Sequence, residues 1–138
     1  MAEENQRLIF LDSSVLIEYF RKTKKENSFF YKLQFEQGYM GFLFSSVVQI
    51  EIYEGVNNKQ KDFWDNLFED LIFVPITKKA TEVAIKIQEE LKSKRRKLTL
   101  GDLIIATAAL TFKTPVATLN ARHFLDIDGL SVVTPNSI

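Results

Sequence analysis

The chain has 138 residues, 46% of them hydrophobic, and its 18 basic and 18 acidic side chains give a formal net charge of zero. This length predicts a single domain spanning residues 1–138 with a sizeable core, and the twelve Phe argue against disorder over most of the chain. A neutral chain has no overall field that would draw it onto nucleic acid, and the lack of Cys excludes disulfides and zinc–thiolate sites.

The sequence also predicts where the protein resides. The N-terminal MAEENQR is polar and lacks the apolar region of a secretory signal, and the longest apolar run, residues 103–112, is too short to span a bilayer. We therefore expect a soluble, cytoplasmic protein without a membrane partner.

Residues 7–20, RLIFLDSSVLIEYF, are the stretch around which the fold is expected to form. The run LIFL predicts a buried, central parallel strand that ends at Asp12, and Ser13 and Ser14 lead into a helix. An acid in this place lies at the carboxyl end of a strand, where open α/β sheets bind ligands. Asp12 could also serve only as the N-cap of the helix, and the stretch alone leaves both interpretations open.

Apolar periodicity predicts that strands and helices alternate along the rest of the chain. The expected further strands are residues 41–44, 71–74, 115–118 and 130–133, and the expected further helices are residues 26–37, 46–55, 59–71, 77–91 and 101–112. Alternation of this kind indicates an α/β fold, a three-layer sandwich whose central, mainly parallel five-stranded sheet is flanked by helices.

Two of these helices carry informative apolar faces. The aromatic stripe of residues 59–71, which includes Phe63, Trp64 and Phe68, is interpreted as core or a subunit contact rather than a platform for stacking bases. In residues 46–55, the residues Val47, Val48, Ile50 and Ile52 predict a helix that packs on the sheet.

Besides Asp12, two acids lie at positions where the surrounding sequence is apolar and a carboxylate is unexpected. Glu51 interrupts the apolar face of residues 46–55, with Glu54 as a rival on the same helix, and the other interpretation is a boundary position in water. Asp102 fits a capping box with Thr99, yet the Ala-rich helix that it opens is apolar on all sides.

A polar cluster follows the fourth expected strand. Thr118 ends this strand at the same edge of the sheet as Asp12, and Asn120 and His123 come next. Two carboxylates about 4 Å apart repel by about 4 kcal/mol at an effective dielectric near 20, so converging acids need a cation. Oxygen ligands favour Mg²⁺ or Mn²⁺, and a chain with one His and no Cys is poorly equipped for zinc.

The order of these segments resembles the PIN domain family of metal-dependent ribonucleases, and the single-domain length resembles a VapC-type toxin. The matching segments are LDSSVLIEYF, SSVVQIEIYEG, LTLGDLIIATAAL and PVATLNARHFLDIDGLSVV. The resemblance implies that Asp12, Glu51 and Asp102 bind the metal, and it favours Glu51 over Glu54. Many members carry a further acid within the segment that here reads TLNARHF, where this chain offers Asn120 and His123.

The implied function is a Mg²⁺- or Mn²⁺-dependent endoribonuclease, the toxin of a toxin–antitoxin pair. The metal would activate a bound water and neutralise charge on the scissile phosphate, and Thr118 or Ser14 would orient that water. The residues expected to grip the backbone of single-stranded or looped RNA are Lys94, Arg95, Arg96 and Lys97.

The resemblance also implies partners. A small antitoxin would restrain the enzyme, and we expect a homodimer, with exposed Phe and Trp side chains of residues 26–37 and 59–71 forming the antitoxin groove or the dimer face. The alternatives are a catalytically inactive PIN-like module that binds a protein or RNA, and a phosphohydrolase with an Asp nucleophile. The second lacks the further acid expected close after Asp12.

Overall fold

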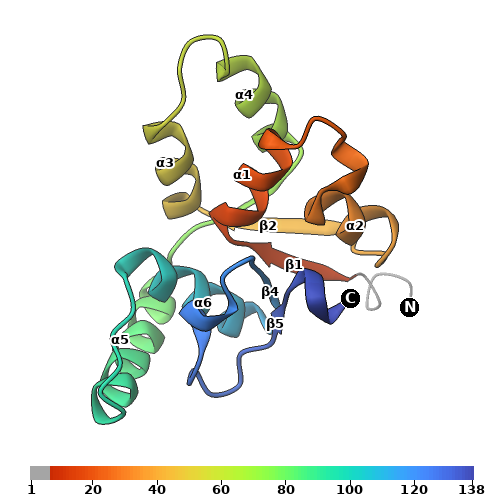
Figure 1. Ribbon diagram of the computed structural model, residues 1–138. Coiled ribbons are helices and arrows are strands. Elements are labelled where there is room, and N and C mark those ends of the chain that lie inside the picture. Colours follow the sequence, from red (N-terminus) through yellow and green to blue (C-terminus); the bar gives the residue numbers. More distant parts are fainter. Residues whose placement is uncertain (1–6) are drawn as a thin grey trace, which may run out of the picture.

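The computed structural model describes residues 7–138, and it places a five-stranded sheet between two layers of helices (Figure 1). All strand pairs are parallel, and the order across the sheet is β3-β2-β1-β4-β5. The strands are β1 (Leu8–Leu11), β2 (Gly41–Ser45), β3 (Ile72–Val74), β4 (Val116–Ala117) and β5 (Val132–Val133). The predicted α/β sandwich with a parallel sheet is thereby confirmed.

Helices cover both faces of the sheet. They are α1 (Ser13–Arg21), α2 (Phe29–Phe35), α3 (Ser46–Glu54), α4 (Lys61–Glu69), α5 (Lys78–Ser93) and α6 (Leu100–Phe112), with the 3₁₀ turns η2 (Lys25–Asn27), η3 (Ala121–Phe124) and η4 (Pro135–Ser137). In Figure 1, α1 to α4 lie above the sheet, and α5 and α6 lie below it. Within residues 7–138, no helix combines the length and the apolar character needed to cross a membrane.

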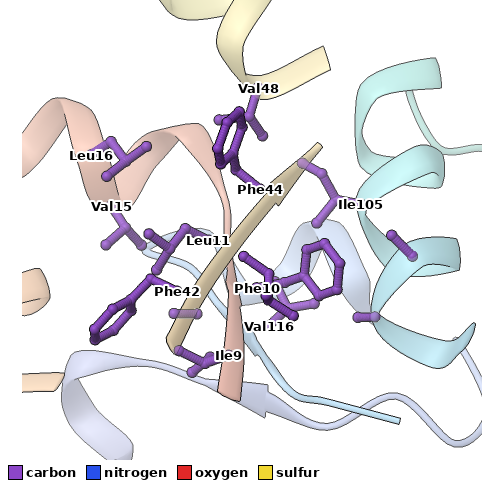
Figure 2. Close-up of a cluster of buried hydrophobic side chains, with 14 of the residues drawn as sticks. Ile9, Phe10, Leu11, Val15, Leu16, Phe42, Phe44, Val48, Ile105 and Val116 are labelled. Atoms are coloured by element: carbon purple, nitrogen blue, oxygen red, sulfur yellow. The ribbon is translucent and has the colours of Figure 1, made fainter. Parts of the chain in front are cut away.

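The central strand β1 explains how the two layers are joined. Its side chains alternate between faces, so that Leu11 lies beside Val15 of α1 while Phe10 points to the opposite side, towards Ile105 of α6 (Figure 2). All three are fully buried, as a central strand of a parallel sheet requires. Because β1 is enclosed on both faces, the residue that follows it, Asp12, is held in a fixed position.

The aromatic residues of α2 and α4 belong to the core. Trp64 of α4 is 3% exposed, and its ring lies 5.2 Å from that of Phe20 at the end of α1. Phe29 and Phe30 are also buried, and only Phe35 of α2 is largely exposed. The core interpretation of the aromatic stripe is confirmed. The expectation of an exposed partner face is wrong for Trp64, Phe29 and Phe30, which are buried, whereas Phe35 is exposed as expected.

Two local predictions also needed correction. Helix α2 begins at Phe29 rather than near Glu26, because the Ser28 hydroxyl accepts a hydrogen bond from the Tyr31 backbone N–H and caps the helix there. Ile50 of α3 does not pack on the sheet but is 67% exposed, whereas Val48 and Ile52 are buried as expected.

Candidate active site

Asp12 lies at the carboxyl end of β1 and is only 5% exposed. Its Oδ2 accepts hydrogen bonds from the Ser14 hydroxyl at 2.9 Å and from the Thr118 hydroxyl at 2.7 Å. Although Asp12 is the N-cap residue of α1 in position, its side chain makes no capping bond to the helix. The interpretation of Asp12 as a simple helix cap is therefore wrong, and the carboxylate is fixed by two hydroxyls instead.

Thr118 is fully buried beside this carboxylate. Its hydroxyl donates to Asp12 and accepts from the backbone N–H of Asn120 at 2.9 Å. The Ser14 hydroxyl in turn accepts from the backbone N–H of Leu119 at 3.1 Å. Both hydroxyls expected to orient a water thus lie against the protein's own groups, and they join β1, α1 and the end of β4.

Replacing Thr118 with Val is expected to lower the free energy of unfolding by about 1–3 kcal/mol. Valine keeps the shape but leaves the Asn120 N–H and the Asp12 carboxylate each without one partner. Urea unfolding measures the loss, and Thr118→Ser should restore most of it.

Thr107→Val is the matched control for this change. Thr107 is 3% exposed, and its hydroxyl has no hydrogen-bond partner among the described residues. Removing that hydroxyl should leave stability unchanged or raise it. If both variants lost the same free energy of unfolding, the hydrogen bonds of the Thr118 hydroxyl would make no specific contribution to stability.

Glu51 of α3 is exposed to solvent, and its carboxylate lies beside Gly101, the residue before Asp102. Its pKa is raised above 4.5, first by partial burial and then by the charges of Asp12, Asp102 and Glu54. A side chain at Gly101 would place its Cβ 3.4 Å from Glu51 Oε2, so this glycine lets the first turn of α6 approach α3 closely. Glu51 is thus a boundary position in water, as the second interpretation predicted, although the charges of Asp12 and Asp102 still affect its pKa.

Asp102 lies in the first turn of α6. Its backbone N–H donates to the Thr99 hydroxyl at 3.1 Å, as the predicted cap requires. Burial, followed by the charge of Asp12, raises the pKa of Asp102, and Thr99 and His123 act in the opposite direction. The Nδ1 atom of His123 lies 3.3 Å from Asp102 Oδ2. The segment TLNARHF, in which many family members carry a further acid, therefore contacts the acid cluster, the name used below for Asp12, Glu51 and Asp102.

The raised pKa of Asp102 predicts that this acid destabilises the metal-free protein at neutral pH. The folded state holds its proton more tightly than the unfolded chain, so stability is lost as pH rises from about 3.8 through the raised pKa. In EDTA, Asp102→Asn should therefore unfold at a higher temperature than the parent at pH 7. The difference in unfolding temperature between Asp102→Asn and the parent should become smaller as the pH falls towards 4.

The control for this experiment is Glu89→Gln, which removes an exposed acid of α5. It should show no comparable gain in melting temperature at either pH. If Asp102→Asn melts below the parent at pH 7 in EDTA, repulsion within the acid cluster is not the dominant effect at this position.

The remaining candidates occupy two sides of the cluster. Asn120 is exposed and lines a pocket with Ser14, whereas His123 and Lys97 line a second pocket with Asp102. The sequence did not single out Arg122, which lies in that second pocket. A basic residue one position before His123 was the available signal.

The basic loop between α5 and α6 has two kinds of residue. Lys94 Nζ donates to the carbonyl of Asp126 at 2.9 Å, and Arg96 lies 3.2 Å from the Asp126 carboxylate. These two cations hold the loop that leads to β5. Arg95 and Lys97 are exposed, and within residues 7–138 neither lies within ion-pair distance of a carboxylate.

The three carboxylates of Asp12, Glu51 and Asp102 are candidate ligands for a divalent metal. Across residues 7–138, no three acid or His side chains already lie close enough together to enclose one ion. The donor chemistry nevertheless fits, because Asp12 and Asp102 raise the pKa of Glu51 and Asp12 raises that of Asp102, as carboxylates that repel one another do. Hard oxygen donors of this kind suit Mg²⁺ or Mn²⁺.

Comparison with known proteins gives three findings. The family model of the PIN domain matches residues 9–130. The chain is 29% identical to Ribonuclease VapC1 from Methanocaldococcus jannaschii over 123 residues. This match covers 88% of this chain and 82% of that protein. The predicted family resemblance is confirmed.

Solved structures of low sequence identity share the fold. DNA-bound VapBC from Salmonella typhimurium matches with a TM-score of 0.80 at 18% identity, over 94% of this chain and 98% of that one. A toxin–antitoxin complex from Klebsiella pneumoniae matches with a TM-score of 0.73 at 23% identity, over 94% of this chain and 99% of that one.

Proposed function

The chain belongs to the PIN domain family, and from this premise we propose that it is a divalent-metal-dependent endoribonuclease that hydrolyses RNA phosphodiester bonds. The observation that carries the proposal is Asp12. Its carboxylate is buried at the end of the central strand, fixed by two hydroxyls, and close enough to Glu51 and Asp102 to raise the pKa of both. A fold tolerates such clustered negative charge where a cation compensates it.

Asp12, Glu51 and Asp102 would hold Mg²⁺ or Mn²⁺. The bound ion would supply Lewis-acid activation of water and neutralise charge on the scissile phosphate. The chain's own residues set the direction of the carboxylates. Ser14 and Thr118 fix Asp12, Gly101 lets Glu51 approach the start of α6, and His123 contacts Asp102. We assign Ser14 and Thr118 a positioning role rather than direct contact with a water.

The basic loop provides cations beside this centre. Lys97 and Arg95 have charges available for RNA phosphates, whereas Lys94 and Arg96 first stabilise the loop around Asp126. A net charge of zero means that these local cations, and not an overall field, would attract the substrate. Single-stranded or looped RNA is the proposed form, because its bases and backbone are accessible.

We further propose that the protein is the toxin of a toxin–antitoxin pair, restrained by a small antitoxin, and that it forms a homodimer. The support is the similarity to Ribonuclease VapC1 and to toxin–antitoxin complexes of the same fold. The buried aromatic residues of α4 cannot provide the dimer face. Exposed apolar side chains available for partners include Ile50, Ile76 and Leu100. Light scattering of the chain alone and with its neighbouring gene product would test both proposals.

The function is tested by mapping RNA ends after expression of the parent and of an Asp12→Asn variant in the same host. New ends that appear only with the parent, and that purified protein reproduces with Mg²⁺ or Mn²⁺ but not in EDTA, would support an endoribonuclease. Unchanged RNA ends, together with no metal binding by titration calorimetry, would instead indicate an inactive PIN-like module.

A further inference from the structure

We propose that a single RNA strand crosses residues 118–123, held on one side of the acid cluster by Arg21 and Lys22 and on the other by Lys97 and Arg122. This inference rests on the proposed endoribonuclease function and adds the path of the substrate. It also gives a role to Arg21 and Lys22, the basic residues at the end of α1, which lie outside the three carboxylates and the basic loop.

The first part of the path is a surface pocket of about 440 Å³ between α1 and the end of β4. Arg21 and Lys22 line it on one side, and Leu119 and Asn120 line it on the other. Ser14, whose hydroxyl donates to Asp12 at 2.9 Å, also borders this pocket. The pocket therefore reaches directly to the side chain that fixes the central carboxylate.

The second part is a pocket of about 390 Å³ that Arg122 and His123, further along the same segment, help to line. Lys97, Arg122 and His123 line it, together with Asp102 of the acid cluster. Both volumes fall within the range of about 300–1,000 Å³ of pockets that hold small ligands. The second pocket thus includes Asp102 itself, and the first is lined by Ser14, which donates a hydrogen bond to Asp12.

Charge in these pockets is available to a substrate. Within residues 7–138, no carboxylate lies within ion-pair distance of Arg21, Lys22 or Arg122. Glu18, the acid that lines the first pocket, accepts a hydrogen bond from the Phe29 backbone N–H at 2.7 Å through Oε1. Cations therefore flank a centre of carboxylates, as a strand with regularly spaced phosphates would require on both sides of a metal-assisted cleavage point.

The apolar residues of the pockets favour an unpaired strand. Leu119 is 37% exposed in the first pocket, and Leu125 is 52% exposed in the second. Exposed apolar side chains beside cations give unstacked bases a surface to pack on while the phosphates meet the charges. Paired bases in a duplex would not be free to enter either pocket.

The test is binding of a short fluorescent oligoribonucleotide of mixed sequence, measured over a range of salt concentrations. In this experiment the parent protein carries Asp12→Asn, because this change stops the proposed cleavage and is shared by every variant compared. Arg21→Ala with Lys22→Ala should reduce the magnitude of the slope of log affinity against log salt by about 1.4, or about 0.7 per lost contact. Over a tenfold change in salt, this difference in slope makes the variant's loss of affinity relative to its parent roughly 25-fold larger at 0.1 M than at 1 M.

The matched control is Lys78→Ala with Lys79→Ala, which removes the same charge from the exposed first turn of α5, away from both pockets. Its salt slope should equal that of the parent. If the Arg21 and Lys22 variant instead behaves like this control while the parent binds RNA, the proposed path is wrong and the nuclease proposal stands. If the parent binds no single-stranded RNA, the proposed function itself fails.

Discussion

Asp12→Asn should lower kcat/KM for metal-dependent RNA cleavage by at least about a thousandfold, or about 4 kcal/mol of transition-state stabilisation. Asp12 is the most deeply buried acid of the cluster, and its Oδ2 is fixed by the hydroxyls of Ser14 and Thr118. Asn keeps the shape and can still accept from these hydroxyls, but it lacks the charge that would hold a divalent cation. Steady-state cleavage in Mg²⁺ and in Mn²⁺ measures the loss.

The fold should survive this change, because it removes negative charge that raises the pKa of Glu51 and Asp102. Circular dichroism should be unchanged, and titration calorimetry should show that metal binding is lost. Asp62→Asn on the exposed side of α4 is the control and should cleave RNA at the parental rate. Near-parental cleavage by Asp12→Asn with the same metal would remove Asp12 from the catalytic machinery.

Local sequence patterns predicted most of the fold. The run LIFL became the central strand because apolar residues in succession suit a strand that is covered on both faces. Thr99 caps α6, as its spacing to Asp102 predicted, and α5 begins next to Thr77, where the expected helix began. These features depend on residues close together in the chain, so a local pattern was sufficient to find them.

Features that depend on distant residues were harder to predict. The sequence placed Asp12 and Thr118 at one edge of the sheet, but only the parallel pairing of β1 with β4 brings the hydroxyl to the carboxylate. The periodicity of the sequence predicted the aromatic face of α4, but it could not predict whether this chain or a partner protein packs against that face. Here α4 packs on α1, with Trp64 against Phe20.

Glu51→Gln should lower kcat/KM by roughly a hundredfold, or about 2.7 kcal/mol. Asp12 and Asp102 both raise the pKa of Glu51, and its carboxylate lies beside Gly101 even though the side chain is exposed. Gln has nearly the same size and helix propensity but cannot supply a charged metal ligand. Calorimetry with Mn²⁺ should show weaker binding in this variant, independently of cleavage.

Glu54→Gln is the matched control, because it makes the same chemical change on the same helix, three residues further along. Glu54 contributes the smallest of the effects that raise the pKa of Glu51, behind those of Asp12 and Asp102. Its replacement should therefore change kcat/KM by no more than about twofold, or about 0.4 kcal/mol. If Glu54→Gln proved the damaging change and Glu51→Gln the silent one, the third carboxylate of the metal site would come from the next turn of α3. The close approach that Gly101 allows would then serve helix packing alone.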